Sequence, residues 1–424
     1  MSTPRTRRAL GLLTVAGLLA MLAFTYSPVL SGQLLAGRDV FRVFFPDSAF
    51  LLESLRAGEL PLWTPYLRLG QPFAGTLYSQ VFYPPRWAAV LVAGPLVSMT
   101  VLQVLHAALA AAGVFLLARR LRASWPASLV AGAMAGLSPM MTDLGIQQNV
   151  VDAAAWTGFI LLAAHDVTHR RGWGPVARLA VYSSLSLFAG SPETTLWQGM
   201  VAVLVAGLGG SVRLQREDTA EAPASRPSAP SGSAPGGGVL ASQVSQAAAA
   251  VDSASGGRPL APEAQKAAGP MDSAPGGIAL APAAPRAVPP LLVLPRREDV
   301  LARAAAAARV VGGLALSAVL AAVALLPAAE FARNSLRSQQ GWSEQLAWSV
   351  SWPQVLSAVW PLADWPRDRY WGQDQWFLLN LFLGTLPCAL AVLGALHGPR
   401  RARPFAIGAL LLVLLSLGRH FPPA

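Results

Sequence analysis

The chain has 424 residues, of which 54% are hydrophobic and 12% charged, and its mean hydropathy is +0.46. Soluble domains carry about 25% charged residues, so this composition excludes an ordinary soluble protein and predicts a polytopic membrane protein. The net charge of +11 does not indicate nucleic-acid binding, because the basic residues form short clusters between apolar runs instead of one basic face.

Apolar runs of about 20 residues, the length of a membrane-spanning helix, recur along the chain. The first follows Arg5, Arg7 and Arg8 and exceeds the roughly 7 to 15 apolar residues of a signal peptide, which favours a retained helix over a cleaved signal. A short apolar piece at 87–93 is expected at the membrane interface. We predict nine spans, at residues 9–30, 96–118, 125–141, 151–168, 175–189, 194–210, 308–328, 376–396 and 405–418.

The basic clusters test this assignment, because lysine and arginine gather in cytoplasmic loops. With alternating spans they all fall on one side, at residues 5–8, 119–122, 169–171, 213–216, 296–309 and 400–403. This pattern predicts a multi-pass protein of the bacterial inner membrane with a cytoplasmic N-terminus. The expected fold class is all-α, a bundle of about nine transmembrane helices with a large, partly helical first periplasmic loop.

Three regions follow from the composition. Residues 1–212 form an N-terminal membrane half of six helices, with a periplasmic loop at 31–85. Residues 213–300 form a cytoplasmic linker rich in Ala, Pro, Gly and Ser. Its repeats, SAPGGGVLA at 233, SASGGRPLAP at 253 and SAPGGIALAP at 273, lack the apolar positions of a stacked solenoid and predict disorder. Residues 301–424 form a C-terminal membrane part of three helices, with a periplasmic loop at 329–375.

Three carboxylates at the outer face are the candidate catalytic residues: Asp39, Asp47 and Glu193. A carboxylate there can act as a general base, and Asp39 can also hold a divalent metal ion. Each of the three also has a purely structural interpretation. Asp39 would be solvated and paired with an arginine, Asp47 would be a helix N-cap after Pro46, and Glu193 would lie in the first turn of a helix. If the segment is helical, Asp39 and Asp47 lie about 12 Å apart, too far to share one ion.

Long loops rich in charges and aromatic residues are more often functional than connecting. In the 31–85 loop, arginines can bind a phosphate in a bidentate manner, and polar aromatic and amide side chains can contact a sugar. The candidate substrate-binding residues are Arg38, Arg42, Arg68, Tyr66, Gln71, Gln80 and Tyr83.

Other polar and aromatic residues are ambiguous. Seven tryptophans in the 329–376 region fit either an interfacial belt or sugar-binding platforms. His106 is the main ionisable residue in the middle of a span, where a core histidine bonded to a neighbouring helix is the simplest reading. Since transporters place ionisable groups near the bilayer midplane, nearly empty span centres favour a site at the outer interface.

Several segments carry a resemblance to a known family. They are GRDVFRVFFPD, ESLRAGELPLWTPYLRLGQPF and YSQVFYPP in the first loop, then AGSPETTLW, NSLRSQQGWSEQLAWSVSWPQVL and LLSLGRHFPP. With these the chain resembles the YfhO-like bacterial membrane proteins, within the GT-C class of glycosyltransferases. Related sequences tend to carry His at the place of Ser191, and they continue beyond the position where this chain ends, so the chain looks truncated.

The resemblance implies an enzyme that transfers a hexosyl or pentosyl group at the periplasmic face. The donor would be a polyprenyl-phosphate-linked sugar in the membrane lipid, and the acceptor an envelope glycan or lipid. By position, the acidic residue that takes part is Asp39. Two other readings stay open: a non-enzymatic transporter, flippase or envelope assembly component, and an inactive truncated paralogue.

Overall fold

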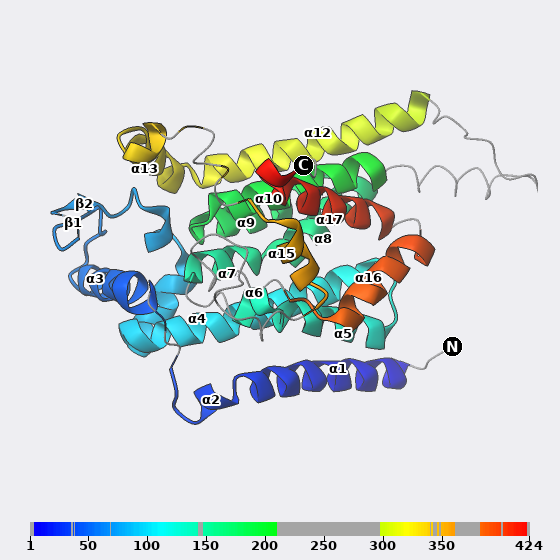
Figure 1. The fold of residues 1–424 in the computed structure, drawn as a ribbon, viewed down its shortest axis with the longest axis horizontal. Helices are drawn as coiled ribbons and strands as arrows, with labels where there is room; N and C mark the ends of the chain where they lie inside the picture. Colours follow the sequence, from blue (N-terminus) through cyan, green and yellow to red (C-terminus); the bar gives the residue numbers. More distant parts are fainter. Residues whose placement is uncertain are drawn as a thin grey trace, which may run out of the picture. The chain divides into compact units, whose positions relative to one another are not determined.

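The computed structural model describes residues 4–34, 37, 39–67, 69–142, 147–209, 297–339, 341, 346, 349–360, 382–399 and 402–421. All of them belong to one compact unit, made of residues 1–221 and 295–424. The described chain is almost entirely helical (Figure 1), in agreement with the all-α prediction. Nearly all of the predicted linker lies outside the described residues, as does the beginning of the predicted span at 376–396.

The first part of the chain contains short and long elements in alternation. In order they are α1 (Pro4–Thr25), α2 (Ser27–Leu30), the π-helical turn η1 (Val40–Phe44), α3 (Phe45–Arg56), β1 (Trp63–Thr64), β2 (Gln71–Pro72), η2 (Leu77–Ser79), α4 (Pro84–Arg120), α5 (Trp125–Gly136), α6 (Pro139–Thr142), α7 (Gln148–Ala154), α8 (Thr157–His169), α9 (Gly174–Phe188) and α10 (Pro192–Gly209). The two strands pair antiparallel, with Trp63 opposite Pro72 and Thr64 opposite Gln71.

The described elements of the second part of the chain are all helices. They are α12 (Arg297–Leu320), α13 (Ala322–Arg333), η5 (Leu336–Gln339), α15 (Trp352–Ser357), α16 (Thr385–His397), α17 (Arg403–Ser416) and η10 (Gly418–His420). Among these, α12 packs most extensively, against α9, α10 and α8.

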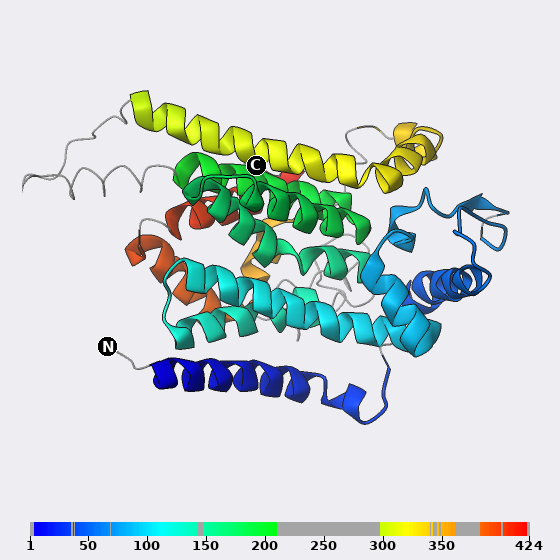
Figure 2. The same ribbon diagram turned by 180° about the vertical axis from the view of Figure 1, so that it is seen from behind.

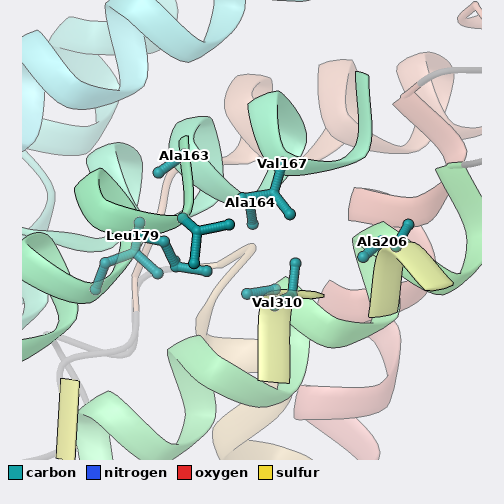
Figure 3. Packing of buried hydrophobic residues seen from close by; sticks show 10 residues of the cluster. Ala163, Ala164, Val167, Leu179, Ala206 and Val310 are labelled. Atoms are coloured by element: carbon teal, nitrogen blue, oxygen red, sulfur yellow. The ribbon is translucent and has the colours of Figure 1, made fainter. Parts of the chain in front are cut away.

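The best-packed core lies where α8, α9, α10 and α12 meet. Val167 of α8, Leu179 of α9, Ala206 of α10 and Val310 of α12 converge there, and all four are buried (Figure 3). On the other side of α8 the contact with α4 is closer still. A Cβ atom on Gly158 would lie 2.4 Å from the backbone of Gly113. Small residues that let helix backbones approach in this way are typical of helix packing in membranes.

Three helical stretches are long and apolar enough to cross a membrane: α4, the continuous stretch Gln148–His169 that joins α7 and α8, and α12. These helices indicate a membrane protein. Not every predicted span is matched by a long helix, since the one at 125–141 corresponds to α5, which has 12 residues. Such a helix rises about 18 Å, less than the roughly 30 Å of a hydrocarbon core. The count of nine spans therefore stays a prediction.

Helix α4 joins two predicted segments, the interfacial piece at 87–93 and the span at 96–118. They meet at Gly94, which has non-helical dihedral angles of φ 75° and ψ 172°. The next residue, Pro95, has no N–H and disfavours the helical conformation at the residue before it, and glycine accepts a positive φ without steric cost. The sequence thus explains why a short first segment and a long second one form a kinked helix.

The helices of the bundle have two distinct ends (Figure 1 and Figure 2). We call one the loop end; it carries residues 39–83, α7, the α9–α10 connection and α13. Two contacts hold it together: Gln80 donates a hydrogen bond to the Ala189 carbonyl, and Gly75 packs on the backbone of Pro327. The opposite end, which we call the arginine end, is where α4 and α8 end and α9 begins.

Candidate functional site

The described part of the first long connection is a packed layer on α4. Leu51 and Leu52 of α3 are buried against Val90 of α4. Val40 and Phe44 of η1 are likewise buried against Met99. These contacts fix the layer to both segments of α4, so the polar side chains that it carries have defined positions.

Asp39 lies at the N-terminal end of the π-helical turn η1, and its side chain is partly exposed. The turn has a local cause. Pro46 has no N–H to donate to the Arg42 carbonyl, so the regular helical bond is absent there, and the Phe45 N–H bonds to the Val40 carbonyl instead. Turns of this kind are rare and occur frequently at functional sites.

Asp47 is buried in the interface between α3 and α4, with 1% of its surface exposed. Its interpretation as an N-cap is wrong, because the N-cap of α3 is Phe44 and Asp47 lies within the first turn. Among the described residues neither of its carboxylate oxygens has a hydrogen-bond partner. Burial raises the pKa of Asp47 to about 7, although the nearby Arg86 guanidinium lowers it in part.

Arg86 is fully buried on the α4 side of the same interface. Its Nη2 atom donates to the Phe44 carbonyl at 3.1 Å and to Ser48 Oγ at 2.6 Å. The guanidinium therefore provides a hydrogen-bond donor for the Phe44 carbonyl at the end of the π-helical turn. It attracts Asp47 electrostatically, without a hydrogen bond. The sequence interpretation missed Arg86. The signal that could have revealed it is an arginine directly after two prolines, at the start of an apolar run.

A second buried cluster, which we call the polar centre, joins the loop to the bundle. It consists of Gln80, Tyr83, His106, Gln148 and Asp152, each with 1% or less of its surface exposed. Tyr83 Oη lies 2.6 Å from His106 Nε2, and His106 Nδ1 lies 3.0 Å from Asp152 Oδ1. Gln148 Nε2 donates to Asp152 Oδ1 at 2.6 Å, and Gln80 Nε2 donates to Asp152 Oδ2 at 2.8 Å.

The hydrogen-bond directions in the polar centre follow from its donors. Trp156 Nε1 can only donate, and it lies 3.0 Å from Tyr83 Oη, which therefore accepts. The Tyr83 hydroxyl is then free to donate to His106 Nε2. His106 Nδ1 keeps its proton for Asp152 and for the Leu102 carbonyl, 2.7 Å away. The Asp152 carboxyl group is thus held by three donors, from His106, Gln80 and Gln148.

The polar centre corrects one step of the sequence interpretation. His106 is a core histidine bonded to a neighbouring helix, as predicted. Asp152 lies near the start of the predicted span at 151–168, after several polar residues, and it is completely buried. The helices of this protein therefore do hold ionisable groups in their interior.

The connection between α9 and α10 packs against η2 of the first long connection. Gly190 has a φ of 90°, and a Cβ atom there would lie 2.3 Å from the Leu77 carbonyl oxygen. Asn149 Nδ2 donates to the Gly190 carbonyl at 3.0 Å. Beside this contact, Gln80 also lines a small cleft with residues of η2, Phe188 of α9 and Ala324 of α13. Of the predicted sugar-contacting residues, only Gln80 is among its lining.

The other predicted site residues are dispersed. Glu193 is exposed in the first turn of α10, as its simpler interpretation predicted, and it accepts a hydrogen bond from Ser191 at 2.7 Å. Arg42 is exposed on η1. Tyr66 is 72% exposed with its ring against the edge of Phe50. Gln71 is buried in β2, and Arg38, Arg68 and the tryptophans 342, 348, 365, 371 and 376 lie outside the described residues.

The structure therefore brings together Gln80 and Tyr83, but it does not gather the three candidate carboxylates into one site. Within the described ranges, no three His, Cys, Asp or Glu side chains come close enough to share a metal ion. Asp39 is a partly exposed carboxylate of the layer, and Asp47 is a buried one with a raised pKa.

Comparisons with known proteins do not place the chain in a family. No family model, no curated protein and no solved structure matches it. The resemblance to the YfhO-like proteins accordingly stays a prediction from the quoted segments.

Proposed function

We propose that the protein is a membrane glycosyltransferase of the GT-C type that takes its sugar from a polyprenyl-phosphate donor at the loop end of the bundle. The observation that carries this proposal is the position of Asp39. It is a partly exposed carboxylate at the start of a rare π-helical turn, on a layer packed firmly against α4. A fixed and accessible carboxylate at the level where apolar helices end suits a substrate whose lipid part stays in the membrane.

In this proposal Asp39 is the general base. Its carboxylate accepts the proton of the acceptor hydroxyl while that oxygen attacks the anomeric carbon of the donor sugar. The bond between the anomeric carbon and the phosphate oxygen breaks, and the polyprenyl phosphate leaves with the electron pair. Arg42, exposed three residues further on, is placed to neutralise the developing phosphate charge.

The orientation belongs to the same proposal. Arginines gather at the end opposite to the loop layer, so the positive-inside rule places the arginine end in the cytoplasm and the loop end in the periplasm.

The proposal is tested by transfer of radiolabelled sugar from polyprenyl-phosphate donors in membranes that contain the protein at matched expression. Asp39→Asn is expected to lower transfer by about 10²-fold or more, because it removes the base. Glu53→Gln is the matched control, since Glu53 is an exposed carboxylate on the adjacent helix α3. Equal transfer by the wild type and Asp39→Asn would refute the assignment of Asp39, and no transfer by either would argue against the enzyme.

The polar centre favours a second candidate, a transporter or flippase. Ionisable residues inside a membrane bundle are functional until shown otherwise. His106 and Asp152, both without exposed surface, form a pair inside helices of membrane-spanning length. A transporter should lose lipid or solute movement in His106→Gln and keep it in Asp39→Asn, whereas the proposed enzyme should lose sugar transfer in Asp39→Asn.

A further inference from the structure

The arginine end holds a second cluster of charges that the proposed function does not use. Asp166 of α8 lies at its centre, with a side chain 10% exposed. Arg120, from the last turn of α4, approaches Asp166 Oδ1 with Nε at 2.6 Å and Nη2 at 2.5 Å. Arg178 of α9 donates from Nη2 to Asp166 Oδ2 at 3.0 Å, and Arg170 Nε lies 3.8 Å from Oδ1.

The charges of this cluster do not cancel. Three guanidinium groups surround one carboxylate, which leaves a formal excess of two positive charges. The excess is accessible, because the side chains of Arg120, Arg170 and Arg178 are 30%, 50% and 45% exposed. Arg170 is too far from Asp166 for a hydrogen bond and forms only an ion pair with it, at 3.8 Å from Nε to Oδ1.

The backbone around the cluster is fixed by another arginine. Arg309 of α12 donates to the carbonyls of Val167, Arg170 and Gly172 at 2.9, 3.1 and 2.7 Å. These bonds hold the turn between α8 and α9, which carries Arg170 and leads into Arg178. Together with the hydrogen bonds to Asp166, they place the guanidiniums of Arg120 and Arg178 and the backbone that carries Arg170 before any ligand arrives.

Apolar side chains lie beside the cluster on the membrane side. Leu116 is one turn before Arg120 on the same face of α4, and Val181 is about one turn after Arg178 on α9. They are 42% and 46% exposed. Trp173, 83% exposed at the start of α9, is of the kind that anchors helices at membrane interfaces. Arg178 lies five residues, about 7.5 Å along the helix, from Trp173 toward the apolar part.

We propose that the cluster of Arg120, Arg170 and Arg178 binds the phosphate of an anionic phospholipid headgroup. The phosphate is the chemistry that several preplaced guanidiniums recognise, because each offers paired N–H donors to phosphate oxygens. The exposed Leu116 and Val181 beside the arginines fit the acyl chains of the same molecule, which favours a lipid over a soluble phosphate. Basic pockets between helices at the cytoplasmic side of membranes bind lipid headgroups in this way.

The test uses the full chain reconstituted with equal amounts of phosphatidylglycerol and phosphatidylcholine, and counts the lipids that native mass spectrometry finds retained. The wild type is expected to retain phosphatidylglycerol preferentially. Removing one arginine should lower the preference for phosphatidylglycerol over phosphatidylcholine about fivefold, because this factor corresponds to the attraction of one basic residue for an anionic lipid. The variants are Arg170→Gln, which breaks no hydrogen bond to Asp166, and Arg178→Gln. Arg56→Gln, an exposed arginine of α3 at the loop end, is the matched control.

Loss of preference in Arg170→Gln and Arg178→Gln, with Arg56→Gln unchanged, would support the site. Equal retention in all variants would overturn it. A parallel sample with millimolar inorganic phosphate distinguishes the source of the ligand, since displacement of phosphatidylglycerol by free phosphate would show a soluble-anion site and overturn the lipid assignment. Arg178→Lys, which keeps the charge, should retain most of the preference and excludes simple misfolding as the cause of a loss.

Discussion

The substitution Asp47→Asn probes the buried interface between α3 and α4. Asparagine has nearly the same shape as aspartic acid and never ionises. In the folded protein burial raises the pKa of Asp47 to about 7, whereas the unfolded chain has a pKa of about 4. The folded state therefore binds the proton more tightly, and this contribution to stability is complete below about pH 4 and is lost as the pH rises to 7.

The size of the effect follows from the difference of about three pKa units. At about 1.4 kcal/mol per unit, ionisation of Asp47 costs the fold about 4 kcal/mol at pH 8. At pH 5 the folded protein still holds the proton, and the cost is about 1.5 kcal/mol. The buried asparagine amide changes the free energy of unfolding by an amount that does not depend on pH, because it has no hydrogen-bond partners of its own. The diagnostic quantity is therefore how the stability difference between Asp47→Asn and the wild type changes from pH 5 to pH 8. It should shift by about 2.5 kcal/mol in favour of Asp47→Asn.

The assay is reversible unfolding of the detergent-solubilised protein, followed by tryptophan fluorescence at pH 5 and pH 8. Glu53→Gln serves as the control, because this exposed carboxylate of the same helix should shift stability equally at both pH values. A stability difference between Asp47→Asn and the wild type that is the same at pH 5 and pH 8 would refute the reasoning. It would mean that Asp47 ionises normally and that α3 opens to water near it.

Two further predictions concern stability and can be checked by thermal unfolding in detergent. Tyr83→Phe removes the hydroxyl that accepts from Trp156 and bonds to His106, and it should lower the free energy of unfolding by about 1 to 3 kcal/mol; an unchanged melting temperature would mean that these two bonds do not stabilise the fold. Gly190→Ala should destabilise by more than about 1 kcal/mol, because its φ of 90° is strained for alanine and its Cβ would meet the Leu77 carbonyl, whereas a neutral outcome would mean that the α9–α10 connection adapts.

The helical character of the chain was predictable because it follows from local features. Apolar runs and prolines mark α1, α4 and α9, and Gly94 with Pro95 explains the interruption of α4. The position of Glu193 in the first turn of α10 was predictable for the same reason, since a proline and an acid favour the start of a helix. These assignments need no knowledge of which helices are neighbours.

The sites depended on contacts that the sequence does not encode locally. Asp47 follows Pro46 and so looks like an N-cap, but the π-helical turn starts the helical path earlier and carries Asp47 into the α3–α4 interface. Asp152 follows several polar residues and so looks like part of an external turn. Its burial depends on the register of α7 against α4, which brings it to His106, 46 positions earlier in the chain.

The polar centre and Asp39 bear differently on the two candidate functions. In the polar centre, Asp152 accepts from three donors and His106 uses both ring nitrogens, so a substrate or ion would have to displace existing bonds before it could enter. Gln80 Oε1 and Gln148 Oε1 are buried in the same cluster without a hydrogen-bond partner among the described residues. The bonds that are formed fix Gln80 and Tyr83, and with them the end of the loop layer, to the bundle. A carboxylate that must meet a substrate needs a rigid support and access to solvent, and Asp39 has both. Under the proposed function, the polar centre would hold in place the layer that carries Asp39.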